Sequence, residues 1–211
     1  MIPKLMHQIW VGPKPRPDKW LQTWQDKHPG WTYKIWDNKD FNAQWKNKRH
    51  MQFYAAKGKW NGVADLMRYE ILYRYGGILV AADSICLNPV DELFENDYKL
   101  YTINTGEYEG GPNLARNRGS VTPLYAAAPG QWFTERLVDD LYLTRNLYSP
   151  VRSTGNRFMQ KQLWAYKPRI KIWPMHLFIS DHFNGWKYKG KDKIFARHFW
   201  GTTKNTYEQG L

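Results

Sequence analysis

Residues 63–83, VADLMRYEILYRYGGILVAAD, decide the fold, because they join a helical pattern to a strand pattern through two glycines. Val63–Tyr75 is the clearest helical pattern in the chain. Gly76-Gly77 supplies the helix stop, since glycine tolerates the backbone conformation in which helices commonly end. Ile78–Ala82 is small or apolar throughout, which predicts a central strand that is covered on both faces of a largely parallel sheet.

Strand-like and helix-like patterns alternate on both sides of this unit. The sequence predicts further strands at Leu5–Trp10, Trp31–Trp36, Lys99–Asn104, Ser120–Ala126, Arg169–Trp173 and Lys193–Phe199, and helices at Asp18–Lys27, Asp37–Lys57, Gln131–Tyr148 and Asn156–Tyr166. This alternation indicates an α/β fold, a Rossmann-like domain with a mixed, mostly parallel central sheet flanked by helices. We find no repeat or linker, so residues 1–211 are predicted to form a single domain, and the chain is compatible with being one module of a longer polypeptide.

Composition restricts the possible partners without selecting one. The formal net charge is +12, and the Lys and Arg residues are scattered along the chain. A broad positive field favours polyanionic partners in general, such as nucleic acid, anionic membranes or diphosphate substrates. Aromatic residues make up 17% of the chain, and their rings suit both core packing and stacking on bases and sugars.

The single cysteine, Cys86, excludes an intrachain disulfide and a cysteine-based zinc site, and it favours a reducing compartment. The start of the sequence lacks the apolar segment of a signal peptide, and no apolar run approaches the roughly 20 residues of a membrane span. We therefore expect a cytoplasmic protein without a transmembrane segment.

Asp83 is the first candidate for chemistry, because it directly follows the predicted central strand. Ligands of α/β sheets collect at the carboxyl ends of the strands, and hard cations take carboxylate oxygens there. The alternative is a solvated carboxylate or a turn former. We favour a ligand, because five small or apolar residues deliver Asp83 to this edge of the sheet.

Several motifs, in chain order, resemble the signature of the DXD sugar-transferase superfamily. They are Ile2-Pro3-Lys4 with His7-Gln8-Ile9-Trp10, then Ala64-Asp65-Leu66-Met67-Arg68-Tyr69, Tyr73–Ile78, Asp83, Cys86-Leu87-Asn88-Pro89, Thr154-Gly155 and His198-Phe199-Trp200. The nearest branch contains mannosyltransferase-like and bacterial capsular transferases, and the chain is also similar to glycosyltransferase modules of chlorella-virus proteins. A viral origin would place it in the host cytoplasm.

The resemblance implies a GT-A fold and a retaining, metal-dependent glycosyltransferase. It implies transfer of a hexose-type sugar from a nucleotide-diphosphate sugar to a glycan acceptor, with a UDP-sugar favoured over a GDP-sugar and with Mn²⁺ or Mg²⁺ as the cofactor. Such a cation acts as a Lewis acid on the diphosphate leaving group. We expect a monomer. A general base is required only if the reaction inverts configuration.

One position departs from the family pattern. Ala81-Ala82-Asp83 stands where the family has Asp-x-Asp, so the metal-binding second aspartate is kept and the first, which holds ribose and sugar hydroxyls, is Ala81. The hydroxyl of Ser84 is a candidate for partial compensation. A catalytically degenerate or carbohydrate-binding module therefore remains an alternative. A nucleic-acid-binding protein is disfavoured, since no recognition-helix, phosphate-loop or zinc pattern is present.

The resemblance assigns roles residue by residue. The candidate catalytic residues are Asp65, Arg68 and Asp83; the candidate donor-binding residues are His7, Gln8, Ile9, Trp10, Asp65, Arg68, Ala81, Asp83, Ser84, Thr203 and Lys204; the acceptor side is Thr154 and Gly155; and the metal ligands are Asp83 and His198.

Some of these residues also have ordinary structural interpretations. Asp65 and Arg68 share a helix face at i,i+3, where a mere surface pair would contribute only about 0.2–0.5 kcal/mol. His198 is alternatively a buried histidine, Trp10 a core residue and Lys204 an exposed surface lysine.

Overall fold

The computed structural model describes residues 1–95, 97–105, 121–122, 125–183 and 185–201. Its centre is a six-stranded sheet with the order β2-β1-β3-β6-β5-β7. The strands are β1 (Leu5–Ile9), β2 (Thr32–Trp36), β3 (Gly77–Leu79), β5 (Leu100–Ile103), β6 (Ala126–Ala127) and β7 (Lys171–Trp173). The β1–β2, β1–β3 and β5–β7 pairs are parallel, whereas β6 runs antiparallel to both of its neighbours. The predicted mixed, mostly parallel sheet is confirmed.

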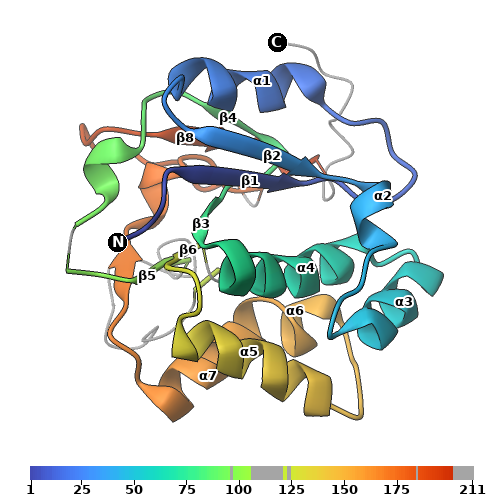
Figure 1. Cartoon of the computed structure of the whole chain (residues 1–211). Coiled ribbons are helices and arrows are strands. Elements are labelled where there is room, and N and C mark those ends of the chain that lie inside the picture. The colour runs from blue at the N-terminus through green and yellow to red at the C-terminus, as the bar shows by residue number, and fades with distance from the viewer. Residues whose placement is uncertain (96, 106–120, 123–124, 184, 202–211) are drawn as a thin grey trace.

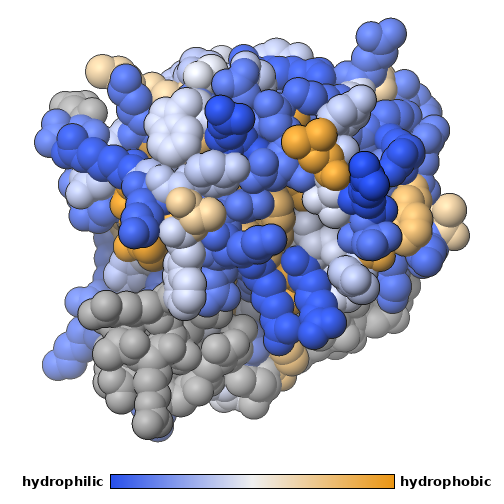
Figure 2. All heavy atoms as spheres, turned by 90° about the horizontal axis from the view of Figure 1, so that it is seen from below, coloured by the Kyte–Doolittle hydropathy of each residue, from blue (hydrophilic) through white to orange (hydrophobic). Residues whose placement is uncertain are grey.

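Helices cover the sheet, and the core consists of two hydrophobic clusters that the sheet separates. They are α1 (Asp18–Lys27), α2 (Asn38–Phe41), α3 (Lys48–Ala56), α4 (Trp60–Tyr75), α5 (Trp132–Leu143), α6 (Pro150–Ser153) and α7 (Asn156–Tyr166), with short 3-10 helices at Asp91–Leu93 and Met175–Leu177. Helix α1 packs on one side, and α4 to α7 form the lower layer in Figure 1. Seen from below, that layer has a mostly hydrophilic surface (Figure 2). In the described part of the chain, none of the helices has the length and apolar character that crossing a bilayer requires.

Two glycines connect α4 to β3, as the sequence predicts. Gly76 and Gly77 both have positive φ, at 66° and 95°. A side chain at Gly77 would collide with the backbone oxygen of Leu5 on the neighbouring strand. Glycine therefore permits both the reversal of the chain and the close approach of β3 to β1.

The expected strand Ile78–Ala82 is shorter than predicted. Only Gly77–Leu79 pairs as β3, although the Val80 amide still donates to the His7 carbonyl at 3.0 Å. The chain then leaves the main sheet and forms β4 (Ser84–Cys86), which pairs antiparallel with β8 (Ala196–His198) in a separate two-stranded sheet. Asp83 consequently lies at the junction between the two sheets.

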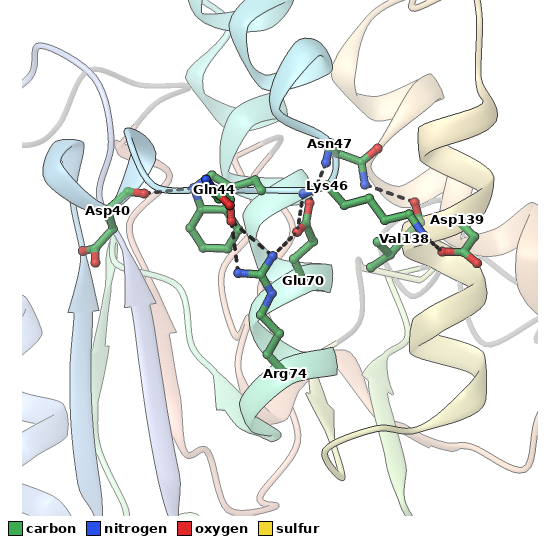
Figure 3. A network of polar contacts seen from close by, with 9 residues as sticks. Asp40, Gln44, Lys46, Asn47, Glu70, Arg74, Val138 and Asp139 are labelled. Carbon is green, nitrogen blue, oxygen red and sulfur yellow. Dashed lines mark hydrogen bonds and ion pairs between the residues drawn. The ribbon is translucent and has the colours of Figure 1, made fainter.

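The single helix predicted at Asp37–Lys57 is wrong, because α2 and α3 are separated by residues 42–47. Buried Glu70 on α4 explains the interruption: its carboxylate accepts the backbone N–H groups of Lys46 and Asn47, both at 2.8 Å (Figure 3). These amides bind the Glu70 side chain instead of helix carbonyls. A tertiary contact has thus overridden a helical sequence pattern.

The same network ties three helices together. Arg74 pairs with the Glu70 carboxylate at 2.9 Å, the Asn47 amide donates to the Val138 carbonyl at 3.0 Å, and Lys46 pairs with Asp139 at 2.5 Å (Figure 3). Helices α3, α4 and α5 are thereby fixed relative to one another.

Helix α5 ends at Leu143, five residues before the predicted end at Tyr148. The following segment is extended, and α6 begins at Pro150. Proline disfavours helical geometry in the residue before it, which prevents one continuous helix across Ser149. Of the predicted strand Ser120–Ala126, only residues 121, 122, 125 and 126 are described, and Ala126 belongs to β6.

Candidate active site

Asp83 and His198 meet between β4 and β8. The antiparallel register places His198 opposite Ser84, the residue next to Asp83. The His198 Nε2 atom lies 3.1 Å from Asp83 Oδ1, and the Gly201 amide donates to Oδ2 at 3.0 Å. Two predicted metal ligands that are far apart in the sequence are therefore in direct contact.

The surroundings of Asp83 keep its carboxyl group ionised. Burial acts to raise its pKa, but the interaction with His198 and the hydrogen bonds from backbone N–H groups act against it and leave the pKa below its ordinary value. His198 Nδ1 accepts the Trp200 amide at 3.1 Å, so Nε2 faces Asp83 and is the nitrogen that would bind a cation once it has released its proton. The site thus contains the Asp83 carboxylate and the His198 imidazole side by side.

These two residues fit a divalent cation that is shared with a substrate. Each Asp83 oxygen accepts one hydrogen bond and keeps further lone-pair capacity. Within the described residues, no group of three or more His, Cys, Asp or Glu side chains could form a complete protein cage for a metal. Mg²⁺-type sites commonly use one or two carboxylates and fill the remaining positions with phosphate oxygens and water. Asp83 and His198 would supply such an incomplete set.

A second cluster brings Asp65 together with both candidate acceptor-side residues. The Thr154 hydroxyl lies 3.1 Å from Asp65 Oδ2, and a Cβ at Gly155 would also lie 3.1 Å from that oxygen. The Tyr69 hydroxyl donates to the Thr154 carbonyl at 2.7 Å and fixes this turn against α4. Burial raises the pKa of Asp65 to about 6, against the opposing effects of Arg68 and Thr154.

Arg68 does not form the simple surface pair with Asp65 that helical spacing allows. No ion pair between the two side chains occurs in the described structure, and the Arg68 Nε atom is buried without a hydrogen-bond partner. A buried N–H group without a partner costs free energy, a cost that an acceptor oxygen of a bound ligand would relieve.

Tyr125 is a further candidate site residue that the sequence analysis missed. It is buried, its hydroxyl is hydrogen bonded to the Ala81 backbone, and it lies within electrostatic reach of both Arg68 and Asp83. It therefore connects the two clusters. It comes from the segment before β6, where the sequence offered no motif.

The candidate donor-binding residues on and after β1 differ in burial: some lie inside the fold and others near the surface. His7 is buried, its Nε2 atom bonds the Gly76 carbonyl at 2.9 Å, and its Nδ1 atom accepts the Trp36 indole N–H at 3.1 Å. Burial lowers the pKa of His7 to about 4, so the ring is neutral at physiological pH. Ile9 is buried in the core. His7 and Ile9 thus act inside the fold, and neither placement favours the predicted contact with a donor.

Gln8 and Ser84 both hold the turn that carries Ala81. The Gln8 amide donates to the Ala81 carbonyl at 3.2 Å, and the Ser84 hydroxyl donates to the same oxygen at 2.6 Å. Ser84 is buried beside the Trp24 indole. Its hydroxyl is therefore engaged inside the protein, which disfavours the expected compensation for the missing first aspartate.

Trp10 remains the first-strand candidate for stacking. It follows β1 at the carboxyl edge of the sheet, is partly exposed, and donates its indole N–H to the Lys14 carbonyl at 2.9 Å. Thr203 and Lys204 lie outside the described residues.

The chain is similar to known glycosyltransferases. Residues 15–100, which include Asp65, Arg68 and Asp83, match the family described as glycosyltransferase sugar-binding region containing DXD motif. The chain is 30% identical over 106 residues to inositol phosphoceramide mannosyltransferase 3 of Schizosaccharomyces pombe, covering 44% of this chain and 27% of that protein. It is 29% identical to inositol phosphoceramide mannosyltransferase 1 of the same yeast, covering 92% of this chain and 65% of the relative.

A viral protein is also similar. An uncharacterized glycosyltransferase of Acanthamoeba polyphaga mimivirus is 24% identical, with 79% of this chain and 66% of the relative covered. The chain thus spans from 27% to 66% of the length of these three relatives.

Two solved structures share the fold. The PaToxG glycosyltransferase has a TM-score of 0.59 at 14% identity, covering 78% of this chain and 69% of that one. A glycosyltransferase involved in the glycosylation of the major capsid of PBCV-1 has a TM-score of 0.54 at 9% identity, covering 97% and 98%. The predicted resemblance to DXD-type glycosyltransferases is confirmed.

Proposed function

Because this chain resembles the DXD-type glycosyltransferases in sequence and in fold, we propose that it moves a hexose-type sugar from a nucleotide-diphosphate sugar to a glycan acceptor. The proposed donor is a UDP-sugar in preference to a GDP-sugar, and the proposed cofactor is Mn²⁺ or Mg²⁺. The observation that carries this proposal is the contact between Asp83 and His198 at the junction of the two sheets.

Asp83 and His198 would hold the cation at the carboxyl side of β3. The ionised Asp83 carboxylate supplies a hard oxygen ligand and His198 an imidazole, a combination that suits Mn²⁺. A bound cation would neutralise the developing charge of the diphosphate leaving group as a Lewis acid.

Arg68 and Asp65 would orient the donor. The Arg68 Nε–H, which has no partner in the described structure, would donate to an acceptor oxygen of the ligand, and the Asp65 carboxylate would accept hydrogen bonds from sugar hydroxyls. Thr154 holds one Asp65 oxygen, which limits the rotation of the carboxylate. Precise orientation of this kind lowers the barrier by pre-organising the reactants.

We propose retention of anomeric configuration. In a front-face reaction the departing phosphate oxygen accepts the proton of the acceptor hydroxyl, so no protein base is required. An inverting reaction would instead need a carboxylate with a suitable pKa, and Asp65, with its pKa of about 6, is the described side chain that would meet this condition. The anomeric configuration of the product, followed by NMR, distinguishes the two reactions.

Thermal-shift measurements with nucleotides and nucleotide sugars, with and without Mn²⁺, test the proposal. A ligand that binds the folded state raises the melting temperature by mass action. We expect UDP or a UDP-sugar to raise it only in the presence of Mn²⁺, and we expect slow donor hydrolysis under the same conditions. A protein that binds no nucleotide or nucleotide sugar, with or without Mn²⁺, would contradict the proposal.

A non-catalytic, carbohydrate-binding role is the second candidate, and Ala81 is the observation that favours it. The methyl group of Ala81 replaces a carboxylate, and the Ala81 carbonyl is held by Gln8 and Ser84. Glycan binding without any consumption of a nucleotide sugar in the presence of Mn²⁺ would support this role over the enzyme.

A further inference from the structure

Two segments of the chain carry Lys and Arg but neither Asp nor Glu. Residues 48–59 contain α3 and the turn after it, and residues 141–153 contain the end of α5, the extended connection and α6. Together they have six basic residues: Lys48, Arg49, Lys57, Lys59, Arg145 and Arg152. We call the surface that these two segments form the basic face.

The two segments of the basic face lie side by side. The Tyr54 hydroxyl donates to the Tyr148 carbonyl at 3.1 Å, and His50 lies near the backbone of Thr144. Figure 1 shows the connection from α5 to α6 running beside α3. Residues that are about ninety positions apart in the sequence therefore build one continuous surface.

Neighbouring acids do not neutralise this surface. Asp139 on α5 pairs with Lys46 at 2.5 Å, and Asp140 accepts the Tyr166 hydroxyl at 2.9 Å. None of the six basic residues of the basic face makes an ion pair with a residue that the structure describes. Lys48 is half-buried and donates to the Phe41 carbonyl, whereas the other five are exposed, so their positive field extends toward solvent.

Apolar side chains stand among these charges. Leu143 is 72% exposed and Val151 50% exposed, and Phe53, Tyr142 and Tyr148 are exposed as well. Figure 2 shows the lower surface as hydrophilic with separate apolar side chains between the polar ones. The basic face is therefore both cationic and apolar.

The exposed side of α3 repeats this mixture within one helix. Arg49, Phe53 and Lys57 follow one another at intervals of four residues, so they share one side of the helix. The Lys57 Nζ atom lies 4.3 Å from the Phe53 ring centroid.

We propose that the basic face docks on an anionic lipid bilayer. Exposed aliphatic groups such as Leu143 and Val151 gain free energy by entering the bilayer interface, where tyrosine also accumulates, while each nearby Lys or Arg is attracted by anionic headgroups. A nucleic-acid surface would use the charges and the aromatic rings but would have no use for exposed Leu143 and Val151. The proposal does not depend on the enzymatic reaction.

The position of the basic face suggests a use. Helix α6 ends at Ser153, and the next residue, Thr154, contacts Asp65 in the candidate active site. A bilayer docked on α3 and α6 would therefore lie beside the predicted acceptor side, so an acceptor at the membrane surface would come within reach.

Vesicle flotation tests this inference. We expect the protein to float with vesicles of phosphatidylcholine containing about 30% phosphatidylserine, but not with pure phosphatidylcholine, and to dissociate as salt is raised. The triple variant Arg49→Glu, Lys57→Glu, Arg145→Glu should bind the anionic vesicles on the order of a hundred-fold more weakly.

Two further variants distinguish electrostatic attraction to the vesicles from insertion of apolar side chains into them. Leu143→Ser with Val151→Ser should weaken vesicle binding without changing the net charge. The matched control Lys187→Glu, Lys189→Glu, Lys191→Glu reverses three exposed charges elsewhere and should bind nearly as the unmodified protein does.

Three outcomes would overturn the inference. One is the absence of flotation with anionic vesicles, and another is an equal loss of binding in the control variant. The third is unchanged vesicle binding by the Leu143→Ser, Val151→Ser variant together with competition by an oligonucleotide, which would assign the surface to nucleic acid.

Discussion

Replacing Asp65 by asparagine should make the protein more stable at neutral pH while it impairs the donor site. Burial raises the pKa of Asp65 to about 6 from the ordinary 3.8, so ionising this group opposes folding. That difference corresponds to about 3 kcal/mol, an upper value because Asp65 keeps partial contact with solvent. Asparagine has a similar shape and can still accept the Thr154 hydroxyl.

The direction of this stability change follows from proton linkage. Between pH 3.8 and about 6 the folded protein holds the Asp65 proton more tightly than the unfolded chain does, so the free energy of unfolding falls as pH rises through this window. The Asp65→Asn variant lacks this loss. Its gain over the unmodified protein should be about 1 kcal/mol at pH 4.5 and should reach about 3 kcal/mol at pH 7.5.

Urea unfolding followed by tryptophan fluorescence at these two pH values measures the effect. Asp83→Asn is the control, because its carboxyl pKa is lowered and its replacement should reduce stability at pH 7.5. An Asp65→Asn variant that is less stable than the unmodified protein at both pH values would refute the reasoning about burial.

Three other substitutions test the fold and the donor pocket. Gly77→Ala should destabilise the protein by roughly 3 kcal/mol in urea unfolding, because its Cβ meets the Leu5 backbone at a positive φ; a neutral effect would mean that β3 can shift. Glu70→Gln should cost about 2 kcal/mol, because an amide cannot serve two backbone donors and Arg74 together, and an unchanged denaturation midpoint would contradict the network. Ala81→Asp should tighten UDP-sugar binding in calorimetry if only a sugar or ribose contact is missing; weaker binding would show a pocket built around alanine.

Local sequence patterns predicted much of the main sheet and its helices. The bounds of α1 and α7 agree with the predicted Asp18–Lys27 and Asn156–Tyr166, and Gly76-Gly77 ends α4 as expected. These elements depend on apolar spacing and on glycine chemistry, which are properties of neighbouring residues. They are therefore readable from the sequence.

Features that depend on distant contacts were not predicted. The interruption between α2 and α3 results from Glu70, which is 23 and 24 positions away from the amides that it binds. The pairing of β4 with β8 joins segments that are more than a hundred positions apart in the chain. No local pattern encodes either contact.

The candidate site was predicted in part, through family motifs. Asp83 with His198 and Asp65 with Thr154 and Gly155 come together in the structure, although the sequence alone gave no distance between them. Tyr125 was missed, because its role depends on a turn made by Ala81. The internal hydrogen bonds of His7 and Ser84 were equally hidden, since burial is a property of the folded chain.

Isothermal titration of UDP in the presence of Mn²⁺, comparing the unmodified protein with Asp83→Ala, tests the central claim most directly. The variant removes the hard anionic ligand at the junction of the two sheets, so we predict Mn²⁺-dependent UDP binding by the unmodified protein and its complete loss in the variant. Circular dichroism confirms that the variant is folded. Equal UDP affinity of the two proteins in Mn²⁺ would contradict the assignment of the metal site to Asp83.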